Sequence, residues 1–308
     1  MLVLFLDRFD RRIRSRKDAE KSFGLPVLAE IPRLKRVRRR HRELVVVAQP
    51  RSHAADAFRI TATMVEMMVI KGVPPSAGPD GNGLEGNGHH DGPIVLDPSR
   101  GSRILIVSAG PEEGKTFVAA NLAAALGIRG DRVTVIGCDL RRPRIHRLFG
   151  AGNAWGLTDV LGPEPTPPLV FQRTAVEGVQ LVSSGPPTDG TARLLGSPKL
   201  PQVLEAAQAR SDVVLIDTAP LLTTADAGEL VRHADGVVIV ARAGRTTAEV
   251  AERTTELLKR LGAPLLGVVL NVTSEMSVPR RYYSYRSYRR PRRSDRGKPQ
   301  LVSHSLKG

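Results

Sequence analysis

The sequence predicts an α/β fold in which helices flank a mostly parallel β-sheet. From Arg103 onward, segments typical of strands alternate with segments typical of helices, as in β-α-β units. Several strand segments are almost continuously apolar, such as VVLID and GVVIVA, as expected where helices cover both faces of a sheet. The first strand runs into a turn ending in Gly-Lys-Thr and then into an alanine-rich helix, which predicts an anion site at the carboxyl end of that strand.

The individual elements follow in order along the chain. Apolar residues at helical spacing predict a helix over 54–71, before the sheet begins. Strands are expected near 103–108, 132–137, 179–183, 212–217, 236–241 and 265–270. Helices are expected near 115–128, 200–209, 226–232 and 246–261. In an open sheet of this kind, ligands bind at the carboxyl ends of the strands.

Composition divides the chain into five segments. Residues 1–50 are basic and are interpreted as membrane-proximal, and residues 51–72 hold the first helix. Residues 73–101 contain seven Gly and five Pro in 29 positions, which predicts a flexible linker. Residues 102–273 form the predicted α/β domain, and the basic, tyrosine-rich segment 274–308 is expected to be a disordered tail.

The positive charge of the chain is concentrated at its two ends. Residues 1–42 hold fourteen Lys and Arg against five Asp and Glu, and residues 280–308 hold ten against one. The two ends together exceed the net charge of +15, so the body between them is mildly acidic. This distribution favours electrostatic contacts made by the ends and argues against a nucleic-acid-binding face on the domain.

The N-terminal end points to a membrane. The apolar start MLVLFL is too short to span a bilayer and is followed at once by basic residues. This pattern fits either the last part of a transmembrane helix or a segment that touches anionic lipid headgroups; a solvated basic arm is the alternative. Cys138 is the only cysteine, so an intrachain disulfide is impossible and a reducing, cytoplasmic setting is expected.

The Gly-Lys-Thr turn has the pattern of a phosphate-binding P-loop, so the expected fold is that of a P-loop NTPase. Gly114 lets the backbone approach a phosphate, Lys115 is expected on the β- and γ-phosphates, and the Thr116 hydroxyl on Mg²⁺. Ala109 stands where the motif usually begins with glycine. The chain is therefore predicted to bind a nucleoside triphosphate. The candidate binding residues are Ala109, Gly110, Pro111, Glu112, Glu113, Gly114, Lys115, Thr116 and Phe117.

Two acidic residues follow other strands of the predicted sheet. Asp217 ends the apolar run VVLID, the pattern of a Walker B aspartate that binds Mg²⁺. Asp139 follows VTVIGC at a second strand end. The alternative for each is a structural role as a helix cap.

Four motifs in this order, GPEEGKT, DLRRP, IDTAP and VVLN, resemble the cytoplasmic domain of bacterial tyrosine kinases of the polysaccharide co-polymerase family. SFGLPVLAEIPRL and GLTDVL are similar to further segments of that family, so the resemblance covers nearly the whole chain. It implies an ATP-dependent, Mg²⁺-dependent tyrosine autokinase that regulates capsular polysaccharide or exopolysaccharide synthesis and export at the cytoplasmic face of the membrane. The implied partners are membrane-embedded export components and further copies of the same chain.

The resemblance also implies roles for individual residues. Lys115, Asp139 and Asp217 would be catalytic, and Thr116 would join the two aspartates around Mg²⁺. Asp139 would be the second acid of the Walker A′ motif. Asn271 would face the adenine. Arg141 and Arg142 would form the basic pair that follows the A′ strand, with ordinary surface arginines as the alternative.

The tail carries every tyrosine of the protein within seven residues, Tyr282, Tyr283, Tyr285 and Tyr288. In the family a C-terminal tyrosine cluster is the autophosphorylation site, in which the tail of one subunit enters the active site of a neighbour. A phenol needs only positioning, Mg²⁺ and a proton acceptor to attack a phosphate. The alternative is a tail that stacks on nucleic acid or lies at a membrane interface.

Three positions depart from the family pattern. Gly137 stands where the A′ motif has its first acid, and Ala62 stands at the last arginine of a Glu-x-x-Arg-x-x-Arg oligomerisation helix that here begins with Asp56 and Arg59. Ala219 replaces the first proline after the Walker B motif. These departures leave a non-catalytic, ATP-binding regulator as the second hypothesis.

Two more distant hypotheses remain. One is a partition-type ATPase on a membrane or on DNA, although such proteins carry a lysine where this chain has Gly110. The other is a basic nucleic-acid-binding module, which the acidic body of the chain disfavours.

Overall fold

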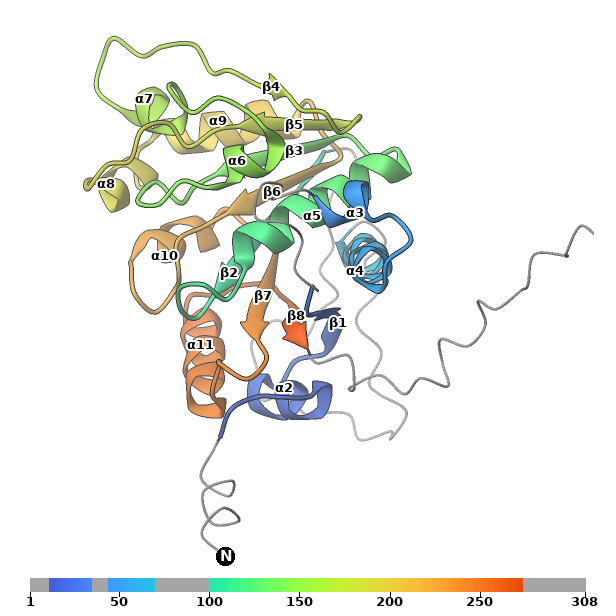
Figure 1. Ribbon diagram of the computed structural model, residues 1–308. Helices are drawn as coiled ribbons and strands as arrows, with labels where there is room; N and C mark the ends of the chain where they lie inside the picture. Colours follow the sequence, from blue (N-terminus) through green and yellow to red (C-terminus); the bar gives the residue numbers. More distant parts are fainter. Residues whose placement is uncertain (1–10, 35–43, 70–99, 274–308) are drawn as a thin grey trace, which may run out of the picture. The chain divides into compact units, whose positions relative to one another are not determined.

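The computed structural model describes residues 11–34, 44–69 and 100–273 (Figure 1). Within them a single sheet has the strand order β1-β8-β7-β2-β6-β3-β5-β4. Every neighbouring pair is parallel except β4 and β5. The strands are β1 (Val27–Pro32), β2 (Ser102–Ser108), β3 (Val133–Gly137), β4 (Gln172–Arg173), β5 (Val179–Val182), β6 (Val213–Asp217), β7 (Gly236–Arg242) and β8 (Leu265–Thr273). The predicted mostly parallel α/β fold is confirmed.

Helices cover both faces of this sheet. Successive side chains of each buried strand point to opposite faces, and since nearly all of them are apolar, both faces must be shielded from water. In β2, Ile104 and Ile106 belong to one core cluster, and Leu105 and Val107 to the other. The first cluster is closed by α3 (Val45–Ala48), α4 (His53–Val69), α5 (Lys115–Arg129) and α6 (Ile145–Phe149). The second is closed by α2 (Arg16–Phe23), α7 (Leu157–Leu161), α8 (Thr191–Leu195), α9 (Lys199–Gln208), α10 (Asp226–Val231) and α11 (Ala248–Arg260).

Helix α5 is the central helix of its layer, and its small residues explain how close it lies to the sheet. Ala119, Ala120, Ala123 and Ala124 are all fully buried, so the helix packs on the strands with little side-chain bulk between them. It ends at Gly130, whose φ of 109° is a left-handed conformation that favours glycine. The helix begins at Lys115, so its N-terminus lies at the carboxyl end of β2, where an anion site is expected.

Part of the segment that the sequence assigns to the membrane-proximal region belongs to the sheet. Strand β1 pairs in parallel with β8, with Val27 opposite Val268, and helix α2 packs against α11. A capping box starts α2, in which Ser15 and Asp18 each accept a backbone hydrogen bond from the other. This strand and this helix were not predicted, so the α/β domain begins well before residue 102.

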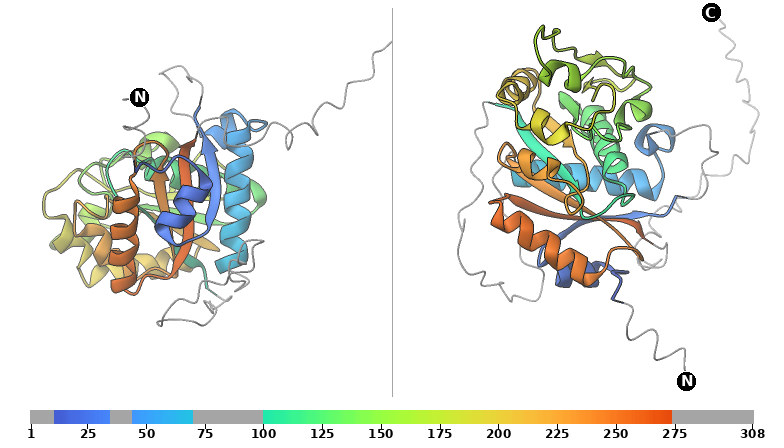
Figure 2. Two further views of the ribbon diagram at one scale, coloured as in Figure 1. Left: turned by 90° about the horizontal axis from the view of Figure 1, so that it is seen from below. Right: turned by 90° about the vertical axis from the view of Figure 1, so that its left-hand side faces the viewer.

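The helix expected over 54–71 is present as α4, which lies alongside β1 (Figure 2). Its Arg59 donates to Asp56 at 2.8 Å and to the carbonyl of Pro50 at 2.8 Å, so these contacts lie within one chain. Ala62 is buried against the core, at 1% exposure. Across the described ranges, no helix combines the length and apolarity needed to cross a bilayer. The apolar start, the linker and the tail lie outside these ranges.

Candidate active site

The P-loop connects β2 to α5 in a conformation that depends on glycine at one position. Gly114 caps the helix with a φ of 100°, and a Cβ atom there would lie 2.1 Å from the side-chain nitrogen of Asn271. Glu112 also has a positive φ, 61°, which is uncommon for a residue with a side chain. The loop therefore has a defined backbone conformation, with Asn271 packed closely against Gly114.

Neighbouring residues hold this loop from behind. The carboxylate of Glu113 accepts hydrogen bonds from the Gly110 backbone at 2.9 Å and from the Thr246 hydroxyl at 2.5 Å. Asn271 donates to the Glu113 carbonyl at 2.9 Å. Burial of Glu113 raises the pKa of its carboxyl group, although these donors oppose the shift. The P-loop is thus tied to the turn after β7 and to the end of β8.

Two arginines add a second support on the outer side of the loop. Arg242, at the end of β7, donates to the Glu112 carbonyl at 2.9 Å, and Arg245 donates to the Glu112 carboxylate at 2.9 Å. The backbone of Ile13 bonds to the same turn, donating to Thr246 and accepting from Gly244. The N-terminal part of the domain therefore supports the turn that supports the P-loop.

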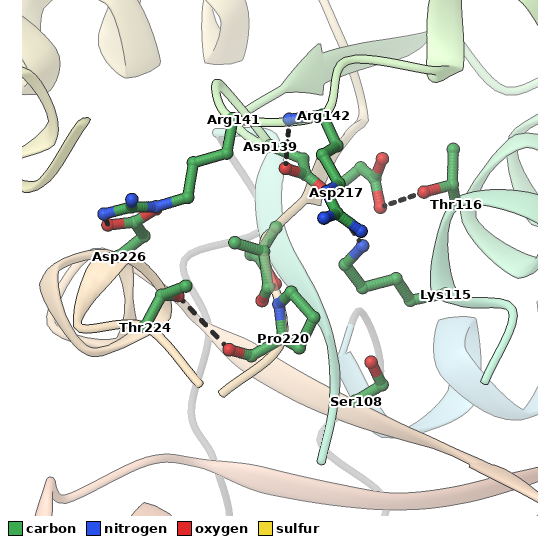
Figure 3. A network of polar contacts seen from close by, with 12 residues as sticks. Ser108, Lys115, Thr116, Asp139, Arg141, Arg142, Asp217, Pro220, Thr224 and Asp226 are labelled. Atoms are coloured by element: carbon green, nitrogen blue, oxygen red, sulfur yellow. Dashed lines mark hydrogen bonds and ion pairs between the residues drawn. The ribbon is translucent and has the colours of Figure 1, made fainter. Parts of the chain in front are cut away.

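The predicted catalytic lysine and the A′ aspartate lie together. Lys115 Nζ is 3.0 Å from Asp139 Oδ2, and each side chain is only 10% exposed (Figure 3). The other carboxylate oxygen of Asp139 accepts the backbone N–H of Arg142 at 3.0 Å. Asp139 therefore links the P-loop to the loop that follows β3.

The second aspartate lies beneath the first helical turn of α5. Asp217 Oδ1 accepts the Thr116 hydroxyl at 3.2 Å, while its Oδ2 is buried without a partner among the described residues. Burial raises the pKa of Asp217 to about 6, with Lys115 opposing the shift and Asp139 adding to it. A buried carboxylate oxygen without a partner, next to a hydroxyl, is a donor set that suits a divalent cation.

These residues border a cavity of about 660 Å³ at the carboxyl edge of the sheet. The predicted site residues on its wall are Pro111, Glu112, Glu113, Gly114, Lys115, Thr116, Phe117 and Asp139. Ala109, Gly110, Asp217 and Asn271 lie behind or beneath that wall and are not part of it. A cavity of this size accommodates a nucleotide-sized ligand.

The sequence did not indicate several other residues of the cavity wall. Some are apolar or small side chains from other elements: Leu34, Val45, Leu148, Pro220, Thr223 and Thr224. Arg141 and Arg142, the basic pair expected after the A′ strand, and Arg144 add positive charge to the same wall. The run of arginines after Asp139 was visible in the sequence, but nothing in it distinguished a cavity arginine from a surface arginine.

Asn271, predicted to face the adenine, has both ends of its amide engaged by the chain itself. Its nitrogen donates to Glu113, and its oxygen accepts the backbone N–H of Val272 at 2.9 Å. Val272 has a φ of 62°, a strained value for a β-branched residue. In this arrangement Asn271 holds the P-loop, and an adenine contact stays a prediction.

The space at the position of the missing A′ acid is filled by Ser184, two residues after β5, and by Ile145 at the start of α6. Gly137 ends β3, and a Cβ atom there would lie 2.5 Å from the hydroxyl of Ser184 and 3.0 Å from Ile145 Cγ2. The Ser184 hydroxyl is itself buried and has no hydrogen-bond partner among the described residues. Gly137 is therefore part of a close-packed site and not an open gap. The four tyrosines of the tail lie outside the described residues.

Comparisons with known proteins identify the family of this chain. A protein-family model described as ParA, a NUBPL iron-transfer P-loop NTPase, matches residues 101–289. The chain is 37% identical over 168 residues to the tyrosine-protein kinase YwqD of Bacillus subtilis, covering 54% of this chain and 71% of that protein. It is 28% identical over 299 residues to the tyrosine-protein kinase wzc of Salmonella typhimurium, covering 93% of this chain but only 37% of that much longer protein.

A solved structure extends the similarity to the fold. The kinase domain of the Escherichia coli tyrosine kinase ETK matches with a TM-score of 0.70 and 25% identity, over 86% of this chain and 96% of that domain. The family match covers more than half of the chain and includes the P-loop residues. The chain belongs to the ParA-type P-loop NTPases and, within them, to the bacterial tyrosine-protein kinases.

Proposed function

We propose that this chain is an ATP-dependent protein-tyrosine autokinase that regulates capsular polysaccharide or exopolysaccharide synthesis and export. One observation carries the proposal, in a chain related to tyrosine-protein kinases: Lys115, Thr116 and Asp139 line one cavity, and Asp217 accepts a hydrogen bond from Thr116 behind its wall. These are the group types that phosphoryl transfer needs, namely a phosphate-binding lysine and acids that hold a metal and orient the acceptor.

Thr116 and Asp217 would hold Mg²⁺. The unpartnered Oδ2 of Asp217 supports this role, because a buried carboxylate oxygen needs a cation or a donor. Mg²⁺ commonly binds through one or two carboxylates, with water and substrate phosphates completing its shell. When bound, the ion would neutralise charge on the β- and γ-phosphates.

Lys115 and Asp139 would exchange partners when ATP binds. In the structure the Lys115 ammonium is paired with Asp139. Its transfer to the phosphates would leave Asp139 free to accept a proton. In the reaction, the tyrosine oxygen bonds to the γ-phosphorus, the bond from that phosphorus to the ADP oxygen breaks, and the phenolic proton passes to Asp139.

The acceptors would be Tyr282, Tyr283, Tyr285 and Tyr288, presented by the tail of a neighbouring copy. The proposed setting is the cytoplasmic face of the bacterial membrane, with the basic N-terminal segment on anionic lipid and export components as partners. The charge at the two ends of the chain supports this arrangement, because the body between them is mildly acidic. No specific nucleic-acid partner is proposed.

A second candidate is a nucleotide-binding regulator of the same assembly without kinase activity. Gly137 favours it, since glycine supplies neither a metal ligand nor a base, and Ser184 occupies the space beside it. A partition-type ATPase is the weaker alternative, because Gly110 replaces the lysine typical of that group.

The test is to compare the full chain with a variant lacking residues 280–308, each incubated with Mg²⁺ and γ-labelled ATP. The autokinase proposal predicts phosphotyrosine on the full chain only, with equal nucleotide affinity for both. Nucleotide binding without phosphotyrosine on either protein would favour the regulator. Label that remained on the shortened chain would contradict the assignment of the tail as acceptor.

A further inference from the structure

The two consecutive arginines after β3 are directed to opposite sides of their loop (Figure 3). Arg141 extends to Asp226, with its Nε 3.0 Å from Asp226 Oδ2. Asp226 is fully buried and also accepts the Thr191 hydroxyl at 2.8 Å. A buried carboxylate with two donors is a strong anchor, so Arg141 is committed to holding the loop in place.

The backbone of Arg142 is held by a hydrogen bond, whereas its side chain has no partner among the described residues. Its N–H donates to Asp139 Oδ1 at 3.0 Å, and the next residue, Pro143, is buried and restricts the backbone. Its side chain extends toward Lys115 and lines the same cavity. Among the residues that the structure describes, its guanidinium group has no hydrogen bond and no ion pair.

Arg142 and Lys115 place two positive charges on the wall of one cavity, which favours an anionic ligand there. Arginine stays charged at any relevant pH, and its planar donors match phosphate oxygens in pairs. The P-loop amides and Lys115 approach the phosphates from the β2–α5 side. Arg142 approaches from the loop after β3, which is separated from β2 by β6 in the sheet. It therefore approaches the phosphate chain from the Asp139 side, where the acceptor would lie.

We propose that Arg142 binds the γ-phosphate of ATP and stabilises its transfer, acting as an arginine finger supplied within the chain. The inference rests on the proposed function and adds a catalytic residue to that site. Arg142 gains and loses no proton in the step; it balances negative charge on the γ-phosphate oxygens while the bond to ADP breaks. Arg141, one residue earlier, also borders the cavity, but its guanidinium group is paired with Asp226, so its assigned role is to position the loop.

Arg144 provides a matched control. It lines the same cavity and carries the same charge, and its guanidinium likewise has no hydrogen bond or ion pair within the described ranges. Its charge adds to the effect of the Arg245 hydrogen bond and charge, which lower the pKa of Glu112. Arg144 therefore adds positive charge to the cavity wall, but unlike Arg142 it has no backbone hydrogen bond to Asp139.

The experiment measures the affinity of the full chain for ADP and for a non-transferable ATP analogue, both with Mg²⁺. Arg142→Ala should weaken binding of the analogue about 10- to 100-fold, the value of a lost charged hydrogen bond, and leave ADP binding within about twofold. Arg142→Lys should recover part of the loss. Arg144→Ala should change both affinities by the same small factor.

The outcomes separate this inference from the proposed function. Equal loss of both nucleotides in Arg142→Ala, or no loss, would overturn the role of Arg142 while leaving the nucleotide site intact. A wild-type chain that bound neither nucleotide would overturn the proposed function and this inference together. Thermal unfolding of each variant shows whether the loop is intact, and Arg142→Ala should unfold at the wild-type temperature because its side chain has no described partner.

Discussion

Lys115 and Asp139 form an ion pair with an Nζ–Oδ2 distance of 3.0 Å, although they lie 24 residues apart and on different strand–helix connections. The pair joins the phosphate-binding loop to the loop that carries Arg142. Both side chains are largely withdrawn from water, so the lysine is held over the cavity and not distributed among solvent rotamers. The pair thereby connects the proposed nucleotide site and the proposed acceptor site.

Replacing this lysine tests the nucleotide site. Lys115→Met should abolish measurable nucleotide binding, because the phosphates lose the mobile positive charge of the P-loop. Lys199→Met is the control, since Lys199 is also partly buried and paired with an acid, Glu164, but lies outside the cavity. Calorimetric titration with Mg²⁺ and ATP measures both variants. Unchanged affinity in Lys115→Met would contradict the site.

Asp217 should limit the stability of the metal-free protein. Its pKa is raised from 3.8 to about 6 by burial, so the folded state disfavours the ionised form. Protonated Asp217 therefore contributes to the free energy of unfolding below about pH 4, and this contribution is lost as the pH rises from about 4 through about 6. Asp217→Asn should be more stable than wild type at pH 8 by about 2–3 kcal/mol in chelator, with the gain shrinking toward pH 4.

Denaturant unfolding at several pH values checks this prediction. Asp226→Asn is the opposite control: Asp226 is equally buried, but its charge is paired with Arg141, so that variant should lose stability. A gain in Asp217→Asn that did not vary with pH would show that the carboxylate charge is not its cause.

Restoring the first acid of the A′ motif by the single substitution Gly137→Asp should destabilise the protein. Gly137→Asp introduces a Cβ atom 2.5 Å from the Ser184 hydroxyl, so it should lower stability by about 1–3 kcal/mol. Ser184→Ala alone should be neutral or slightly stabilising, because the hydroxyl is buried without a described partner. The double variant should recover part of the stability lost.

That double variant is the proper background in which to ask whether the missing acid limits phosphoryl transfer. Thermal unfolding of the four proteins measures the coupling. If Gly137→Asp cost the same with Ser184 and with alanine at that position, the steric account of this site would be wrong.

Asn271 should act on the P-loop without touching phosphate. Asn271→Ala removes the donor to the buried Glu113 carbonyl, which costs about 1–3 kcal/mol and should weaken nucleotide binding by loosening the loop. Asn153→Ala is the matched control, because Asn153 bridges the Gly185 backbone in the same manner away from the cavity. It should lower stability without changing nucleotide affinity. Equal effects on affinity would refute the role of Asn271.

Much of the α/β core could be predicted because its strands and its first helix are marked by short sequence patterns. The strands 103–108, 236–241 and 265–270 are apolar runs bounded by polar turns, and each lies within two or three residues of its observed bounds. Helix α5 follows from the P-loop pattern and its alanines. The five-residue helices α6, α7 and α8 were missed, since each is too short to display a helical period.

Strand β1 was missed for a different reason. Its six residues stand among basic residues that dominate the composition, and its partner β8 lies more than two hundred positions later. Only that pairing makes it a strand. The contacts of the site could not be predicted from the sequence either. Arg141 and Arg142 look equivalent there and both border the cavity, but only the folded structure shows that Arg141 is paired with Asp226.

The most direct test of the proposed kinase activity is phosphotyrosine on the purified full chain after incubation with Mg²⁺ and ATP. The wild type is compared with Lys115→Met and with a variant in which Tyr282, Tyr283, Tyr285 and Tyr288 are all phenylalanine. A tyrosine autokinase should give signal in the wild type alone, with nucleotide bound by the wild type and by the tyrosine variant. Absence of phosphotyrosine in a wild-type chain that binds ATP would contradict the kinase activity and leave a nucleotide-binding regulator.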